Sequence, residues 1–285
     1  MTQEAQRLGE FLRARREAIS PETIGIVSVG RRRRVRGLRR EEVAQRANIS
    51  TEYYTRLEQA RVPPPSPSVL AALVDALLLD PDEELYLYEI TRPRQSPNVT
   101  FPPPPVPARA IRLIEDLATL PALVFNPFMH VLAWNAQAAE LFVDFAAVPA
   151  AERNLARLMY MDPEFRERFV DWPEIARACT AIIRMGAARH PDDPGLAVLL
   201  EELLQHDEGF AHHWEAQGVA RRPRSRNSYL HPVVGPMMLD WQILTSADSP
   251  DHLIAVVSPG DATGSADAFR RLAERCRHGG PGSQI

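Results

Sequence analysis

Three polar residues, Thr51, Glu52 and Arg56, have side chains that could hydrogen-bond to the edges of DNA bases. Arginine can bind guanine through two parallel hydrogen bonds, and glutamate can accept one from the N4 amino group of cytosine. Helices that enter the major groove contact bases mainly through the residues of their first turns. These three residues share one face at the start of a helix if that helix begins after Ser50. An ordinary solvated helix face is the alternative interpretation.

Apolar residues on both sides of position 48 predict two short helices that pack against each other. They recur at intervals of three and four, which places them on one face of each helix. These residues are Val43, Ala44, Ala47, Ile49, Tyr54 and Leu57. Asn48 lies where the chain must reverse, and asparagine tolerates the left-handed conformation better than most residues. Ser50 is suited to cap the second helix, so the segment predicts a helix-turn-helix.

Arginines flank the predicted motif and suit contacts with DNA phosphates. Arg39, Arg40 and Arg61 lie at its ends, and the helix N-terminus at Ser50 also suits an anion. Residues 31–36 contain five arginines, which predicts a solvated arm that contacts phosphates or the minor groove. A solvated charge run without a partner is the alternative. The candidate DNA-binding residues are Arg31, Arg32, Arg33, Arg34, Arg39, Arg40, Ser50, Thr51, Glu52, Arg56 and Arg61.

Composition predicts a globular protein of about two domains with opposite charge. Residues 1–61 contain 14 arginines and 8 acidic residues, and the remainder contains 19 arginines and 29 acidic residues, for a net charge of −4. A basic first module beside an acidic second one is typical of a DNA-facing domain joined to a domain with another task. Two cysteines are too few for a disulfide framework, and no apolar run or leader predicts a membrane span or secretion. We therefore expect a cytoplasmic location.

Helix caps and a proline-rich segment divide the chain. Ser66-Pro67 and Asp80-Pro81 each predict the start of a further helix, and Glu83 completes a capping box with Asp80. Residues 1–91 are therefore predicted to form an all-α helix-turn-helix domain of five helices. Residues 92–107, of which seven are proline, predict a semi-rigid linker that spans up to about 50 Å. A docking motif for a proline-binding partner is the alternative.

The second domain is predicted to span residues 108–278, followed by a flexible tail at 279–285. Its pattern begins with a helix and two short strands, continues with helices, and ends with strands and a final helix. The predicted strands cover residues 121–126, 130–134, 219–224, 228–232, 237–244 and 252–258. This order predicts an α+β domain with an antiparallel sheet and helices across one face of the sheet.

The motifs resemble those of a known family. Residues 1–91 resemble the XRE-type helix-turn-helix regulators, and Gly37–Ala44 with Tyr53–Gln59 are similar to its MmyB-like branch. The second domain resembles the PAS-like ligand-binding domain of that branch. The supporting segments are Trp134-Asn135, Asn154-Leu155, Asp162-Pro163, Asp171-Trp172, His231–Gly235 and Leu239-Asp240.

Two positions depart from the pattern of that family. Ala60 replaces the glycine that usually follows the recognition helix, and Trp214–Val219 lacks the usual His-Asp pair. We expect Ala60 to shift the chain's exit from the helix, because alanine lacks the freedom of glycine at positive φ.

The resemblance implies a transcription regulator whose DNA affinity responds to a small hydrophobic ligand such as a fatty acid. We further expect a homodimer, whose two-fold symmetry would place two recognition helices on a palindromic DNA operator. The resemblance implies no other cofactor. The candidates for lining the ligand pocket are Phe142, Met159, Phe169, Trp172, Trp214, Met238 and Trp241. Arg226, Asn227 and His231 are the candidates for binding a carboxylate head group. Plain core packing is the alternative for the aromatic and methionine side chains.

Other kinds of chemistry find little support in the sequence. The segment with His206, Asp207, His212 and His213 lacks the three- or four-residue spacing that places zinc ligands on one helix face. No set of nucleophile and base stands out, so we expect no enzyme activity. Two other functions of the second domain stay open, a protein-interaction platform without a ligand and an enzyme domain tethered to DNA.

Overall fold

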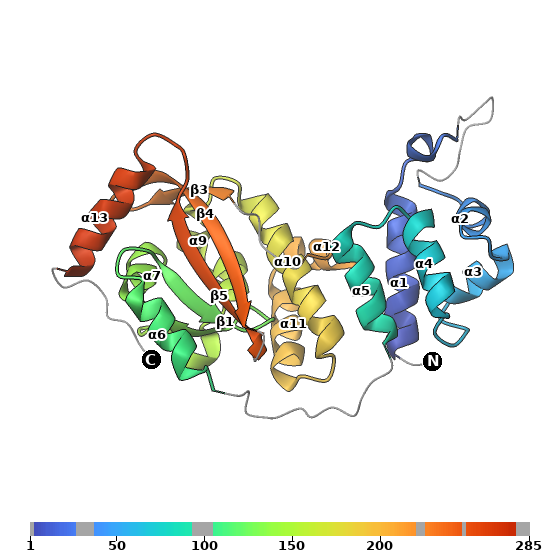
Figure 1. Ribbon diagram of the computed structural model, residues 1–285, viewed down its shortest axis with the longest axis horizontal. Coiled ribbons are helices and arrows are strands. Elements are labelled where there is room, and N and C mark those ends of the chain that lie inside the picture. Colours follow the sequence, from blue (N-terminus) through green and yellow to red (C-terminus); the bar gives the residue numbers. More distant parts are fainter. Residues whose placement is uncertain (1–2, 27–36, 93–104, 221–225, 247–248, 278–285) are drawn as a thin grey trace. The chain divides into compact units, whose positions relative to one another are not determined.

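The computed structural model describes residues 3–26, 37–92, 105–220, 226–246 and 249–277 (Figure 1). The chain divides into two compact units, Met1–Pro97 with Glu215–Val219, and Asn98–Trp214 with Ala220–Ile285. Most of the predicted linker and the whole predicted tail lie outside the described residues.

The described part of the first unit is helical. Helix α1 packs against α3 and α5, and α2 packs against α3 and α4. The shared core contains side chains that are at most 1% exposed, among them Phe11, Val43, Leu57 and Leu73. The predicted all-α domain is confirmed. Its elements are α1 (Gln3–Ala18), a 3₁₀ helix (Pro21–Ile24), α2 (Arg40–Arg46), α3 (Thr51–Glu58), α4 (Pro67–Ala76) and α5 (Pro81–Thr91).

Hydrogen bonds between near neighbours start the helices where the sequence predicts them. Asn48 has a φ of 51°, the left-handed conformation expected at the reversal between α2 and α3. The Ser50 hydroxyl accepts a hydrogen bond from the Tyr53 backbone N–H at 3.1 Å. Asp80 and Glu83 form the predicted capping box, with distances of 2.9 and 3.1 Å. Each such cap contributes about 1 kcal/mol, and together they fix the turn and the position of α3.

The described part of the second unit contains an antiparallel sheet with the strand order β2-β1-β5-β4-β3. Its strands are β1 (Ala122–Phe125), β2 (Val131–Trp134), β3 (Arg226–His231), β4 (Gly235–Ser246) and β5 (Ser249–Pro259). Its α-helices are α6 (Ala108–Asp116), α7 (Ala136–Leu141), α8 (Leu155–Met161), α9 (Pro163–Glu167), α10 (Trp172–Arg189), α11 (Pro194–His206), α12 (Glu208–Glu215) and α13 (Ser265–Arg277), with a 3₁₀ helix at Ala150–Glu152. The predicted α+β class is confirmed.

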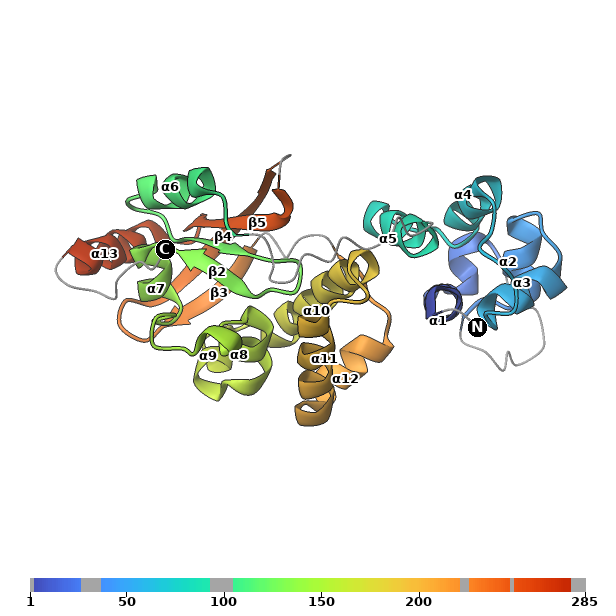
Figure 2. The same cartoon turned by 90° about the horizontal axis from the view of Figure 1, so that it is seen from below.

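Helices cover both faces of this sheet, so the prediction of helices across one face is wrong. Helix α6 lies on the opposite side of the sheet from α7, α8 and α9 (Figure 2). Leu123 and Phe125 of β1 point into the main core, whereas Ala122 and Val124 point into a smaller core with Ile114 of α6. Because β1 is apolar on both sides, each face of the sheet must be covered from water.

The predicted strand at 219–224 does not form in its described part. Val219 and Ala220 lie outside any strand, and residues 221–225 are outside the described ranges. The outer edge of β3 is instead paired with the segment after α9. The Leu230 N–H donates to the Arg168 carbonyl at 2.7 Å, and the Val170 N–H donates to the Ser228 carbonyl at 3.2 Å. This segment covers the β3 edge.

Asn135 joins three elements of the second unit. Its side-chain oxygen caps α7 at Ala138 and accepts from the N–H of Ala122 in β1, both at 3.0 Å. Its amide nitrogen donates to the carbonyls of Ile114 and Leu120 at 3.0 and 2.9 Å. The residue is 3% exposed, so these bonds satisfy a buried polar group that would otherwise destabilise the core.

Candidate functional site

The exposed face of α3 carries the side chains predicted to read bases. Thr51, Glu52 and Arg56 are exposed, whereas Tyr54 and Leu57 on the opposite side are at most 1% exposed. The helical period of 3.6 residues produces this separation. The structure therefore brings the three candidates together on a polar face that is free of the packing between α1, α2 and α3.

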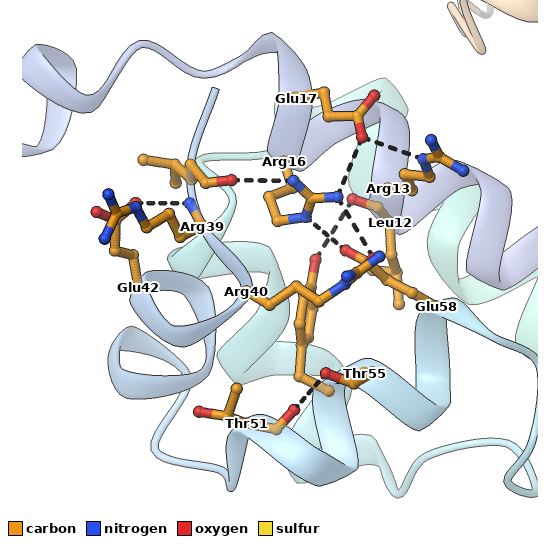
Figure 3. Close-up of polar contacts among 12 residues, drawn as sticks. Leu12, Arg13, Arg16, Glu17, Arg39, Arg40, Glu42, Thr51, Thr55 and Glu58 are labelled. Atoms are coloured by element: carbon orange, nitrogen blue, oxygen red, sulfur yellow. Dashed lines mark hydrogen bonds and ion pairs between the residues drawn. The ribbon is translucent and has the colours of Figure 1, made fainter. Parts of the chain in front are cut away.

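A charged cluster, formed by Arg16, Arg40 and Glu58, lies at the C-terminal end of α3 (Figure 3). The Glu58 side chain is 1% exposed and accepts hydrogen bonds from Arg16 Nε at 2.6 Å and Arg40 Nε at 2.7 Å. Arg16 also donates to the Leu38 carbonyl at 2.9 Å. Burial lowers the pKa of Arg16, but the hydrogen bond and charge of Glu58 more than offset burial, so the pKa is raised.

Sequence reasoning missed Arg16 and Glu58. The two residues are 42 positions apart, on α1 and α3, and no local pattern links them. A signal does exist in the sequence, because Arg16 follows Leu12 at a spacing of four and so falls on the buried face of the first helix. An arginine on such a face requires a buried acidic partner.

The other flanking arginines are held less tightly. The Arg39 side chain is 52% exposed and pairs with Glu41 at 3.2 Å, which is a surface ion pair. The Arg39 backbone N–H donates to Glu42 Oε2 at 2.6 Å and so helps to start α2. Arg61 is exposed just after α3. Arg31, Arg32, Arg33 and Arg34 lie outside the described residues.

Ala60 adopts the left-handed conformation that a glycine would take at this position, with a φ of 55°. The Ala60 N–H donates to the Leu57 carbonyl at 3.1 Å, and the Arg61 N–H donates to the Arg56 carbonyl at 2.9 Å. This is a common ending for a helix. The expected shift of the chain's exit is therefore wrong. The replacement is accommodated as backbone strain of about 1–2 kcal/mol.

In the second unit, an aromatic cluster fills the core between α7, α9 and the inner face of the sheet. It consists of Phe142, Phe165, Phe169, Tyr229 and Trp241. Phe142 stacks on Trp241 with 5.4 Å between ring centroids, and Phe169 meets Tyr229 edge to face at 4.9 Å. Three of the pocket-lining candidates, Phe142, Phe169 and Trp241, therefore lie together, in contact with other rings.

Three further candidates lie among the neighbouring helices. Met159 is 4% exposed, and its carbonyl accepts a hydrogen bond from Trp172 Nε1 at 2.9 Å. Trp214 stacks on Phe210 at 5.9 Å, with the Arg184 guanidinium 3.9 Å from its ring centroid. These contacts connect α8, α10 and α12, so Trp172 and Trp214 have a packing role whether or not a ligand binds.

Met238, a further candidate for the ligand pocket, does not face the aromatic cluster. Successive side chains of a strand point to opposite faces of the sheet. Met237 and Leu239 point into the main core, so Met238 between them points away from it. Its methylenes pack against Gly260 instead. Met237 is the methionine of this strand that reaches the core.

Arg226, a candidate for binding a carboxylate head group, already binds two carboxylates of the protein. It donates to Asp240 at 2.7 Å and to Asp261 at 2.9 Å. The hydrogen bonds to Asp240 and Asp261 raise the pKa of Arg226, and the hydrogen bond from Arg226 lowers the pKa of Asp240. A ligand carboxylate at Arg226 would therefore have to displace an aspartate.

The other two head-group candidates are buried. Asn227 of β3 is 4% exposed, opposite Leu239 of β4. His231 is 3% exposed, and its Nε2 lies 2.9 Å from the Glu140 carbonyl. Its Nδ1 accepts from the N–H groups of Val233 and Val234 at 3.1 and 3.2 Å. These partners require a neutral imidazole protonated on Nε2. Nδ1 of His231 thus stabilises the turn between β3 and β4, and Nε2 ties this turn to α7.

A groove lies between α10 and the ends of β4 and β5. Its volume is about 70 Å³. It is lined by Ile182, Met185 and Arg189 of α10, by Ile243 of β4 and by Leu253 of β5. The remaining lining residues are Pro127, Gly186, Ala220, Thr245 and Pro250. Sequence reasoning missed this groove, because the stripe of Ile182, Met185 and Arg189 is also typical of an ordinary core helix.

The histidines of the segment around α12 have ordinary surroundings. His213 Nδ1 lies 2.9 Å from the Tyr160 hydroxyl, which packs α12 against α8. Across the described ranges, no three His, Cys, Asp or Glu residues are grouped as metal ligands would be. None of the described helices has the length and apolar character to cross a membrane.

Comparison with known proteins covers both units. Residues 7–87 match the model of a helix-turn-helix domain. Residues 106–272, more than half of the chain, match the model described as the MmyB-like transcription regulator ligand binding domain. A search of curated proteins found no match.

Proposed function

Since this chain belongs to the MmyB-like transcription regulators, we propose that it binds a palindromic DNA operator as a homodimer and responds to a small hydrophobic ligand such as a fatty acid. DNA binding by the helix-turn-helix and a ligand-binding second domain come from the family itself. The operator symmetry, the dimer, a cytoplasmic location and the chemistry of the ligand are our proposal. The families that match are transcription regulators rather than enzymes.

The observation that carries the DNA part is the exposed polar face of the capped helix α3. Thr51, Glu52 and Arg56 extend from this face, while Ser50 fixes the start of the helix. Two such helices in a two-fold dimer would read half-sites about 34 Å apart, one turn of DNA. A palindromic operator follows from that symmetry.

The test of the DNA part compares two arginine variants by fluorescence anisotropy. Arg56→Ala should relax the preference for one base pair, because Arg56 projects from the base-reading face. Arg39→Ala should weaken binding to specific and random DNA alike and lower the salt dependence by about one phosphate contact. Equal losses from both variants on both DNAs would contradict these assignments.

For the ligand part, the groove of about 70 Å³ between α10 and the sheet combines apolar side chains with one arginine, a lining that suits part of a molecule with an apolar chain and an acidic group. Ile182, Ile243 and Leu253 give the groove apolar lining, and Arg189 adds a positive charge to it. Such a ligand can regulate DNA binding only if it binds two arrangements of the protein with different affinity. The alternative, a protein-interaction platform without a ligand, is favoured by the close ring contacts inside the aromatic cluster.

Native mass spectrometry of the full chain, before and after organic extraction, tests the ligand part. We expect an extractable lipid-sized mass in the wild type. Ile243→Trp should remove it by filling the groove, whereas Leu244→Trp should not, because Leu244 is 46% exposed and is absent from the groove lining. A clean mass in the wild type, with DNA binding intact, would favour the interaction platform.

A further inference from the structure

We infer that the buried Glu58 carboxylate is a positioning residue for DNA binding, which holds the Arg40 guanidinium for contact with a backbone phosphate. The inference rests on DNA binding through α3. It concerns a residue that touches no DNA itself and acts through its neighbour.

The Arg40 guanidinium is hydrogen-bonded along one edge, and its other edge is exposed. Arg40 is the first residue of α2, and its side chain is 44% exposed. Its Nε–H donates to Glu58 Oε2 at 2.7 Å (Figure 3). Within the described ranges, its two terminal nitrogens have no acceptor. A guanidinium held through Nε keeps its terminal N–H groups for a second anion, and phosphate suits this fork geometry.

Arg16 makes this arrangement electrostatically favourable. Its side chain is 6% exposed, and it donates to the same Glu58 carboxylate at 2.6 Å. The three side chains carry a net charge of +1, because one carboxylate faces two guanidinium groups. Arg16 also pairs with Glu17 at 3.1 Å, but Glu17 is balanced by Arg13 at 3.1 Å, so the positive charge of Arg40 stays available for a phosphate.

The position of the cluster also fits a phosphate contact. In a helix-turn-helix, the first helix of the motif crosses the DNA backbone while the second enters the groove. Arg40 begins the first of these helices, α2, and Glu58 ends the second, α3. The ion pair thus ties the helix that meets the backbone to the helix that meets the bases, and fixes their register on DNA.

The experiment compares Arg40→Lys with Arg13→Lys in the full chain, titrated with operator and random DNA over a range of salt. Lysine keeps the charge but is a point donor, which cannot hold Glu58 and a phosphate in the same fork geometry. We expect Arg40→Lys to weaken both complexes about tenfold, equivalent to about 1.4 kcal/mol, with an unchanged salt slope. Arg13→Lys should stay within about twofold, because Arg13 pairs with Glu17 at the surface and is not a candidate DNA contact.

Glu58→Gln separates positioning from simple electrostatics, because it makes the domain more positive by one charge. A purely electrostatic role predicts tighter binding for this variant. Positioning predicts weaker binding in a variant whose circular dichroism remains native, and no further loss when Glu58→Gln is combined with Arg40→Lys. If Glu58→Gln does not fold, Arg40→Lys decides the question.

The outcomes distinguish this inference from the proposed function. Wild-type affinity in Arg40→Lys, with a loss in Arg56→Ala, would overturn the role of Glu58 and leave DNA binding by α3 intact. No binding of any DNA by the wild-type chain would contradict the proposed function itself.

Discussion

Replacing Ala60 with glycine should stabilise the helix-turn-helix unit, because Ala60 has a φ of 55°. An L-residue in the left-handed conformation costs about 1–2 kcal/mol. Glycine removes that cost but loses about 0.5–1 kcal/mol through the greater conformational entropy of its unfolded chain. The expected net gain in the free energy of unfolding is about 0.5–1 kcal/mol. For a domain of this size, this raises Tm by roughly 2–8 °C.

Urea unfolding of the full chain can show which of the two units gains stability. The four tryptophans, Trp134, Trp172, Trp214 and Trp241, all belong to the second unit. Far-UV circular dichroism follows both units, whereas tryptophan fluorescence follows the second. Ala60→Gly should move the transition of the first unit to higher urea and leave the fluorescence transition unchanged. DNA affinity should also be unchanged, because Ala60 already has the glycine-like conformation.

Gln59→Gly is the matched control, since Gln59 is exposed and has a φ of −90°. Glycine relieves no strain there, so this variant should lose about 0.5–1 kcal/mol. If Ala60→Gly destabilised the first unit as much as Gln59→Gly, the strain assigned to Ala60 would be refuted.

Three further predictions concern the second unit, each followed by tryptophan fluorescence in urea. Asn135→Ala should lower the free energy of unfolding by about 2–4 kcal/mol, because it removes a helix cap and leaves buried backbone groups unpaired. A loss below about 1 kcal/mol would contradict this prediction. Gly186→Ala should destabilise the second unit by about 1–3 kcal/mol, because an added Cβ would lie 2.6 Å from the Pro127 carbonyl oxygen. Gly195→Ala, in a more open position, is the control and should destabilise the unit less. Burial lowers the pKa of His231 in the folded protein below the ordinary histidine value of about 6.5. The contribution of neutral His231 to stability is therefore full above about pH 6.5 and is lost as the pH falls through the pKa of the folded state. The wild type should therefore lose more stability between pH 8 and pH 5 than His231→Asn, and parallel pH profiles would show that His231 does not titrate.

The sequence by itself determined the helix-turn-helix. The left-handed Asn48, the Ser50 cap and the Asp80-Glu83 capping box each depend on residues at most four positions apart. Such contacts form wherever the local sequence allows them, so the pattern is sufficient to predict the exposed face of α3. The family resemblance and the α+β class of the second domain followed from segments of the same local kind.

Tertiary structure alone decided the partners of the candidate side chains. Arg40 contacts Glu58 from 18 positions away, and Arg226 contacts Asp261 from 35 positions away. The orientation of Met238 depends on the register of β4, in which a shift of one residue reverses every side chain. The groove lined by Ile182, Ile243 and Leu253 likewise requires α10 to meet two distant strands. Periodicity shows which face of an element is buried, but the neighbour that buries it is set by the folded chain as a whole.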